Sequence, residues 1–158
     1  MRKNLALFIL CVLLMSLSSS GLTDLLGELS QEDIIASFPS WEERAAGYMP
    51  DLDSITKLQA LDVPVQIEVF LGTWCPDSIE HVSSFFKILD MTDNPLLMVT
   101  YTGLPRDKEA REVYIQGKNI KKIPTFIFYL NNQEIGRIIE HPNKTIEKDM
   151  ADILANIN

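Results

Sequence analysis

The stretch that decides the fold is residues 70–78, which read Phe-Leu-Gly-Thr-Trp-Cys-Pro-Asp-Ser. It ends a β-rich apolar run over residues 65–71 and begins a segment, residues 76–89, whose apolar side chains recur at helical spacing. Cys75 therefore lies where a buried strand turns into a helix. Pro76 falls at the first helical position, where its fixed φ and missing N–H cost nothing.

The helix N-terminus is expected to act on the Cys75 thiol. Its free amide donors and positive dipole end favour a thiolate over a thiol. Ser78 lies about one turn further on, where its hydroxyl can donate to the sulfur, whereas Asp77 opposes the thiolate by like-charge repulsion. We therefore predict only the direction of the effect, namely that the Cys75 thiol is more acidic than that of a free cysteine.

The rest of the chain supplies the elements of an α/β domain. The patterns predict strands over 65–71, 96–102, 125–130 and 134–139, and helices over 76–89, 109–116 and 144–157. The first strand, helix and second strand form a β-α-β unit, which implies a parallel pair with a right-handed crossover. The last two strands flank a short polar turn that suits an antiparallel hairpin. Asn143 is the expected N-cap of the closing helix.

These residues resemble the thioredoxin family, in which a tryptophan precedes a Cys-x-x-Cys pair at the same strand-to-helix junction. Residues 120–126, Ile-Lys-Lys-Ile-Pro-Thr-Phe, are similar to the family's loop in which a cis-proline packs against the active-site sulfur. The resemblance covers about residues 62–158. It implies a thioredoxin-like fold, a central mixed β-sheet flanked by helices, with a cis Ile123-Pro124 bond. It also implies that the partner-binding surface includes Trp74, Pro76, Ile123 and Pro124.

The chain departs from the family at Ser78, which stands where thioredoxins have their second cysteine. In thioredoxins the second thiol breaks the mixed disulfide formed by the first, and a serine hydroxyl cannot do so. The resemblance therefore assigns the catalytic positions to Cys75 and Ser78 but requires an external thiol to resolve the mixed disulfide, as in the family's monothiol members. The other interpretation is that the pair has decayed and the fold serves binding.

A second departure concerns the acid that moves protons in thioredoxins, six residues before the first cysteine. That position is Val69 here. Glu68 is adjacent, but strand alternation points it to the opposite face. Glu140, after the last expected strand, is the candidate proton relay, and a solvated strand-end glutamate is the alternative.

The first 20 residues have the pattern of a secretory signal peptide. Arg2 and Lys3 form a positive segment, 13 apolar residues follow, and Ser18–Ser20 are small. An uncleaved anchor is the alternative, although spanning a bilayer takes about 20 apolar residues. Residues 21–61 are expected to form a helical extension that pads the main domain, and residues 62–158 the thioredoxin-like domain.

The net charge and the cysteine content limit the classes of partner and the kinds of site that the chain can have. Without Arg2 and Lys3, 12 basic residues remain against 22 acidic ones, a net charge of about −10. Nucleic acid and membrane surfaces are therefore excluded as partners after signal cleavage. Cys11 leaves with the signal, so an internal disulfide is impossible in the exported chain, which we expect to be a monomer outside the cytoplasm, periplasmic or secreted. His81 and His141 show no clustering with other ligands, so we expect no metal site and no cofactor.

The sequence favours an exported protein of thiol-disulfide exchange, with a polypeptide or small-molecule thiol or disulfide as partner. The alternative is a non-catalytic binding module that uses the cis-proline groove. The sequence therefore leaves undecided whether the protein is an enzyme. A peroxidase is disfavoured because peroxiredoxins place threonine where Gly72 stands. An iron–sulfur glutaredoxin is disfavoured because its Cys-Gly-Phe-Ser segment differs from residues 75–78.

Overall fold

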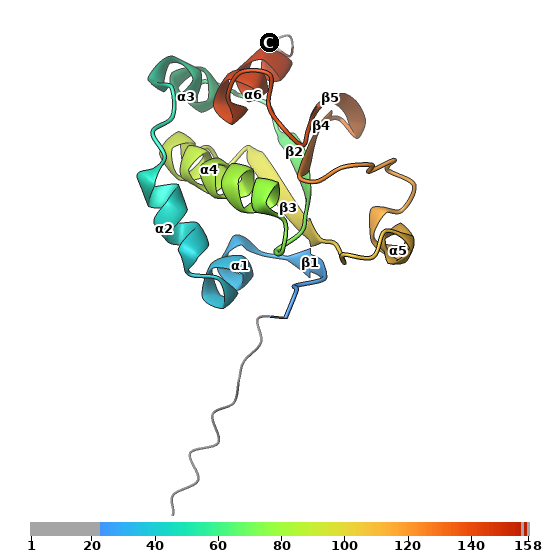
Figure 1. The fold of residues 1–158 in the computed structure, drawn as a ribbon. Helices are drawn as coiled ribbons and strands as arrows, with labels where there is room; N and C mark the ends of the chain where they lie inside the picture. Colours follow the sequence, from blue (N-terminus) through green and yellow to red (C-terminus); the bar gives the residue numbers. More distant parts are fainter. Residues whose placement is uncertain (1–22, 156, 158) are drawn as a thin grey trace, which may run out of the picture.

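A five-stranded mixed sheet forms the centre of the protein (Figure 1). The structure is a computed structural model that describes residues 23–155 and 157. The strand order is β1-β3-β2-β4-β5, with β2 and β3 parallel and the other neighbours antiparallel. The strands are β1 (Gly27–Leu29), β2 (Val65–Leu71), β3 (Leu97–Gly103), β4 (Thr125–Leu130) and β5 (Gln133–Ile139).

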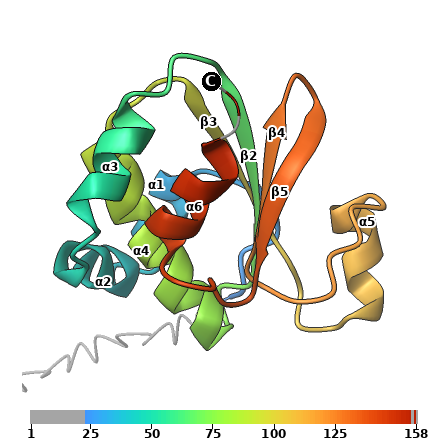
Figure 2. The same cartoon turned by 90° about the horizontal axis from the view of Figure 1, so that it is seen from above.

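Helices cover both faces of this sheet. They are α1 (Gln31–Ser37), α2 (Ser40–Gly47), α3 (Leu52–Gln59), α4 (Pro76–Thr92), the 3-10 turn η1 (Glu109–Arg111), α5 (Glu112–Ile115) and α6 (Ile146–Leu154). Figure 2 shows α2, α3, α4 and α6 on one side of the sheet and α5 on the other. The predicted α/β thioredoxin-like fold, a mixed sheet flanked by helices, is confirmed.

The central strands are apolar because both of their faces are covered. On the α4 side, Val69 and Phe126 are fully buried in the larger core cluster. On the α5 side, Phe70 and Ile127 pack in a smaller cluster that also contains Cys75. The site therefore belongs to the smaller core, at the end of β2.

The predicted elements after Val63 are present, with shifted ends. The helix expected over 109–116 begins as the 3-10 turn η1 and continues as the four-residue α5. The N-cap of α6 is Thr145 and not Asn143. The reason is that the Asp149 carboxylate accepts the backbone N–H groups of Asn143 and Lys144, at 2.6 and 3.2 Å, and so holds the chain in a tight turn before the helix.

The segment before β2 is not helical throughout, which corrects the expectation for residues 21–61. β1 pairs with β3 at the edge of the sheet, with Leu29 opposite Tyr101. The sequence did not reveal it because three residues are too few to show strand alternation. α1 begins at the N-cap Ser30 with a capping box, and α3 begins at the N-cap Asp51.

The helices before β2 contribute to the main core. Ile34, Trp41 and Leu58 are buried within the larger cluster. Glu147 of α6, itself buried, accepts hydrogen bonds from Tyr48 Oη at 2.8 Å and from the Asp51 backbone N–H at 3.0 Å. α1–α3 are thus bound to the sheet domain by packing and by a buried carboxylate.

The predicted signal peptide, residues 1–20, lies outside the described residues. Among the helices that the structure describes, none combines the length and the apolar character needed to cross a membrane.

Candidate functional site

Cys75 occupies the N-cap of α4, as predicted, with Pro76 at the first helical position. The Cys75 backbone N–H donates to the Gly72 carbonyl at 2.9 Å, which closes the turn between β2 and α4. The residue is 8% exposed. Cys75 is therefore a free but buried cysteine.

The Ile123-Pro124 peptide bond is cis, which confirms the prediction. Cys75 Sγ lies 3.8 Å from the carbonyl oxygen of Ile123, so the thiol faces the residue before the cis-proline. Ile123 packs in the same small core cluster as Cys75, and Trp74 packs against that cluster. The structure thus brings Cys75 together with Trp74 and the Ile123-Pro124 loop, although Ile123 and Pro124 are buried and not exposed as expected for a partner-binding surface.

Ser78 is fully buried, and its hydroxyl oxygen accepts the Gly72 backbone N–H at 3.1 Å. Among the hydrogen bonds of the described residues, none joins the Ser78 hydroxyl to the Cys75 sulfur. The expected donation to the sulfur is therefore not present, because the hydroxyl is aimed at the end of β2. Ser78 acts here as a structural support for the turn that carries Cys75.

Trp74 is fixed by three polar contacts that the sequence did not reveal. Its indole N–H donates to the Leu104 carbonyl at 3.0 Å, and the guanidinium groups of Arg106 and Arg111 lie 5.2 and 5.5 Å from the ring centroid. Arg111 is buried and also donates to the Pro105 carbonyl at 2.9 Å. A cation close to an aromatic face is favourable, so the two arginines hold the indole beside Cys75.

The position that holds a buried acid in the family carries no charge here, because it is occupied by Val69. The Val69 side chain is fully buried. Glu68 points to the other face, as alternation predicted, where both carboxylate oxygens accept from Lys118 Nζ at 2.8 and 2.7 Å. Tyr129 Oη donates to the same carboxylate at 3.1 Å. Glu68 therefore forms an ion pair with Lys118 on the α5 side of the sheet.

Glu140 lies directly beside the cis-proline. Its backbone N–H donates to the Pro124 carbonyl at 2.7 Å, and its φ of 62° is in the left-handed region. Its carboxylate pairs with Lys122, and this hydrogen bond holds the pKa of Glu140 below its usual range. The proton-relay role stays a prediction, and the Lys122 pair favours the carboxylate form over the acid that would donate a proton.

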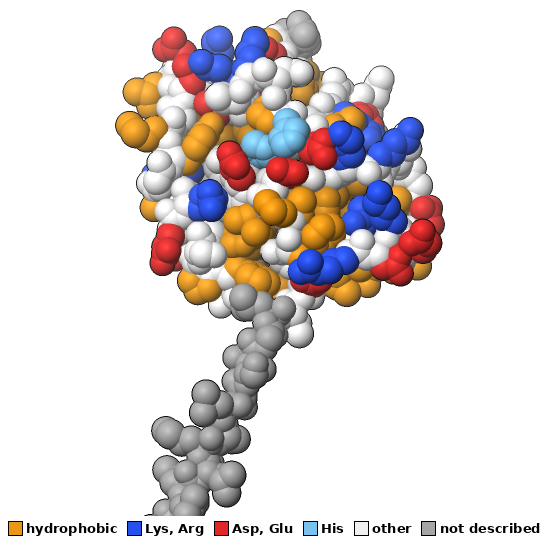
Figure 3. Space-filling view, viewed as in Figure 1, with side chains coloured by type: hydrophobic (Ala, Val, Ile, Leu, Met, Phe, Trp, Pro, Cys, Tyr) orange, Lys and Arg blue, Asp and Glu red, His pale blue; other side chains and the backbone are white. Residues whose placement is uncertain are grey.

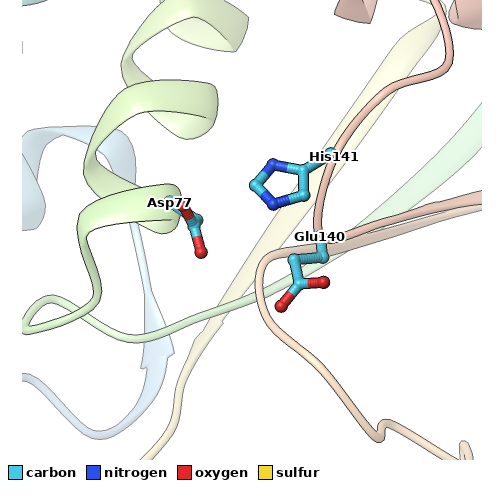
Figure 4. Close-up of side chains that lie close together, drawn as sticks. All are labelled: Asp77, Glu140 and His141. Atoms are coloured by element: carbon cyan, nitrogen blue, oxygen red, sulfur yellow. The ribbon is translucent and has the colours of Figure 1, made fainter.

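The two histidines, which nothing in the sequence connects, lie together at this site. His81 Nε2 is 3.2 Å from His141 Nδ1, with the rings edge to face. Burial lowers the pKa of His81. The ligand atoms of Asp77, Glu140 and His141 lie within 4.8 Å of one another, and Figure 4 shows the three side chains close together, with Asp77 beside the His141 ring and Glu140 below it.

Figure 3 shows how these groups lie on the surface. The chain has only two histidines, and they form one pale blue patch bordered by acidic side chains. A hydrophobic area lies next to this patch, with basic side chains along its far side. A docking partner would therefore meet an apolar area with charged groups of opposite sign at its borders.

Comparisons with known proteins agree with this architecture. A family model described as thioredoxin matches residues 40–153. No curated protein sequence matches the chain significantly.

Among solved structures, a protein of unknown function from Pseudomonas aeruginosa aligns with a TM-score of 0.54 at 16% identity, covering 82% of this chain and 85% of that one. An HIV epitope-scaffold aligns with a TM-score of 0.55 at 16% identity, covering 82% of this chain and 86% of that one. These two likenesses concern the fold alone. Because the family model spans well over half of the sequence, the chain belongs to the thioredoxin family.

Proposed function

We propose that this protein carries out thiol-disulfide exchange through the single thiol of Cys75, outside the cytoplasm, with a polypeptide or small-molecule thiol or disulfide as its partner. The observation that carries the proposal is the position of Cys75 Sγ, 3.8 Å from the carbonyl that precedes the cis-proline, at the N-terminus of a 17-residue helix. A helix N-terminus favours a thiolate, which is the nucleophile in such exchange.

The exchange reaction can be completed without a second thiol from this protein. The Cys75 thiolate attacks a partner disulfide, forms a mixed disulfide with one sulfur and releases the other as a thiolate. An external thiol then attacks the mixed disulfide, binds the partner's sulfur and releases the Cys75 thiolate. Ser78 is occupied by the Gly72 N–H and has no sulfur to contribute.

The low exposure of Cys75 favours one alternative, a binding module in which the thiol is only part of the groove. A residue that is 8% exposed reacts slowly with bulky reagents unless they fit the groove. The two functions differ in whether the sulfur is needed, and this difference can be measured.

The test uses protein with Cys11 replaced by Ser, so that Cys75 is the remaining thiol. Incubation with oxidised glutathione should add one glutathione to Cys75, and added dithiothreitol should remove it completely, as followed by intact-mass spectrometry. A folded protein that forms no mixed disulfide with glutathione or with a peptide disulfide would contradict the proposal.

A matched control separates catalysis from binding. Proteins captured by Cys75 should be released by reducing agent and should be absent from the Cys75→Ser variant. Glu68→Gln changes an acid on the same side of the sheet as the Cys75 cluster, but this carboxylate is paired with Lys118, so the variant should leave mixed-disulfide formation unchanged. Undiminished capture by Cys75→Ser would favour the binding module instead.

A further inference from the structure

The cluster of Asp77, Glu140, His81 and His141 is not used by the proposed exchange reaction. Asp77 is the second residue of α4, whereas Glu140 and His141 follow β5. The fold therefore brings together donors from two segments that are far apart in the sequence (Figure 4). We propose that Asp77, Glu140 and His141 bind a divalent transition-metal ion of the zinc class, with His81 positioning His141. This inference does not depend on the proposed function.

The donor set is suited to such an ion. Two carboxylates and one imidazole offer oxygen and nitrogen ligands, which zinc accepts, and a fourth position is left for water or a partner group. Tetrahedral ligand atoms lie about 3.3 Å apart at metal–ligand distances of about 2.0–2.1 Å. The three donors lie within 4.8 Å of one another. The ligand atoms that are farthest apart would therefore have to approach one another by about 1.5 Å or less to bind one ion.

The contact between the two histidines uses Nδ1 of His141 and leaves Nε2 of the same ring available to bind a metal ion. Nδ1 of His141 is 3.2 Å from His81 Nε2, so these two atoms share one proton. When His141 Nδ1 is the donor, its Nε2 is unprotonated, and Figure 4 shows the other ring nitrogen on the side of the carboxylates. Metal-binding histidines commonly have such a partner at their non-ligating nitrogen.

Charge also favours a cation at this position. Asp77 and Glu140 bring two negative groups close together, and in the described part of the chain Lys122 is the cation that pairs with either of them. The Lys122 side chain is 59% exposed, so a metal ion can displace it at modest cost. Lys122 and the metal ion should therefore compete for Glu140.

Zinc binding can be measured by competition with a chromophoric chelator, with isothermal titration as a second method. We expect one Zn²⁺ per chain, and a higher melting temperature in the presence of Zn²⁺. His141→Ala and Asp77→Asn should each weaken binding by about tenfold or more, and His81→Ala by about tenfold because it removes the positioning hydrogen bond. Co²⁺ in the same site should show ligand-field bands without a thiolate charge-transfer band.

Two further variants keep the test decisive if a substitution disturbs folding. Glu140→Gly removes a ligand at a residue whose φ of 62° suits glycine, so the variant should fold and lose affinity. Lys122→Met removes the competing cation and should tighten binding by about two- to fivefold at low salt. A merely structural role for these residues would not produce tighter binding.

Two control variants should bind zinc with the affinity of the parent protein. Glu134→Gln alters an acid that pairs with Arg137 near the opposite end of β5, and it should leave zinc affinity unchanged. Cys75→Ser should also bind zinc normally. The absence of binding at millimolar Zn²⁺, affinity unaffected by His141→Ala, or loss of binding in Cys75→Ser would each refute the site.

Discussion

The hydroxyl oxygen of Ser78 accepts the backbone N–H of Gly72 at 3.1 Å, so the residue that replaces the family's second cysteine holds the end of β2 against the first turn of α4. The Ser78 hydroxyl is therefore engaged with the backbone at this position. The position has a structural role in the turn that presents Cys75, and this role determines what happens when the sulfur is restored.

Replacing Ser78 with cysteine, in protein with Cys11→Ser, should permit a disulfide with Cys75. The positions are three residues apart across the first turn of α4, as in the family's Cys-x-x-Cys pair. Mild oxidant should consume both thiols and leave a monomer, as measured by thiol titration and size-exclusion chromatography. The reduced variant should be less stable than the parent by about 1 kcal/mol, because sulfur is a weaker acceptor for the Gly72 N–H. Two thiols that stay free, or intermolecular dimers alone, would contradict this geometry.

Gly72 should not tolerate a side chain. A Cβ there would lie 2.8 Å from the Trp74 ring and 2.9 Å from Ile123 Cδ1. Gly72→Ala should therefore displace the indole from its contacts with Leu104 and the two arginines and cost about 1–3 kcal/mol of stability. Chemical denaturation measures the cost, and tryptophan fluorescence reports the displacement. Unchanged fluorescence and stability would show that the indole is not held against this turn.

Glu147 should be essential for the attachment of the N-terminal helices. Its buried carboxylate accepts from Tyr48 Oη and from the Asp51 N–H. Glu147→Ala leaves both donors without a partner, so we expect a loss of about 2–4 kcal/mol in the free energy of unfolding. Glu147→Gln, which keeps an acceptor oxygen, should lose less. Equal losses in urea denaturation would mean that the negative charge of Glu147, which both variants remove, matters more than the acceptor oxygen that glutamine keeps.

Acid should weaken the start of α3. Hydrogen bonds from Ser54 hold the pKa of Asp51 below its usual value, with a smaller contribution from Lys148. A carboxyl whose folded pKa is depressed stabilises the protein above the unfolded pKa, about 3.9, and this contribution is lost as the pH falls through the folded pKa. Asp51→Asn should therefore lose less stability than the parent between pH 6 and about pH 3. Parallel stability curves for the two proteins would contradict this assignment.

The neighbourhood of Cys75 could be predicted from sequence because local rules determine it. A strand-ending glycine, an N-cap and a proline at the first helical position lie within residues 70–78, and the cis-proline motif follows the family pattern. β1 could not be predicted, because it forms only by pairing with Tyr101 and its neighbours in β3.

The histidine pair was missed for a related reason. His81 and His141 are 60 residues apart, and only the docking of α4 beside the chain after β5 brings them within 3.2 Å. Likewise, the arginines at Trp74 lie in the loop after β3 and in η1, where no spacing rule connects them to the indole. Side chains that meet through tertiary packing leave no periodic signal in the sequence.

The hydrogen bond from the Leu25 N–H to Thr73 Oγ1, at 3.2 Å, has a practical meaning for protein production. The carbonyl of Leu25 also approaches Gly103, where an added Cβ would lie 2.2 Å from it. The chain just ahead of β1 thus lies against the loop that carries Trp74 and Cys75. An affinity tag fused a few residues upstream would emerge beside the Cys75 thiol, whereas one placed after α6 would leave that face clear. Reactivity assays are best made with the tag at the carboxyl end or removed.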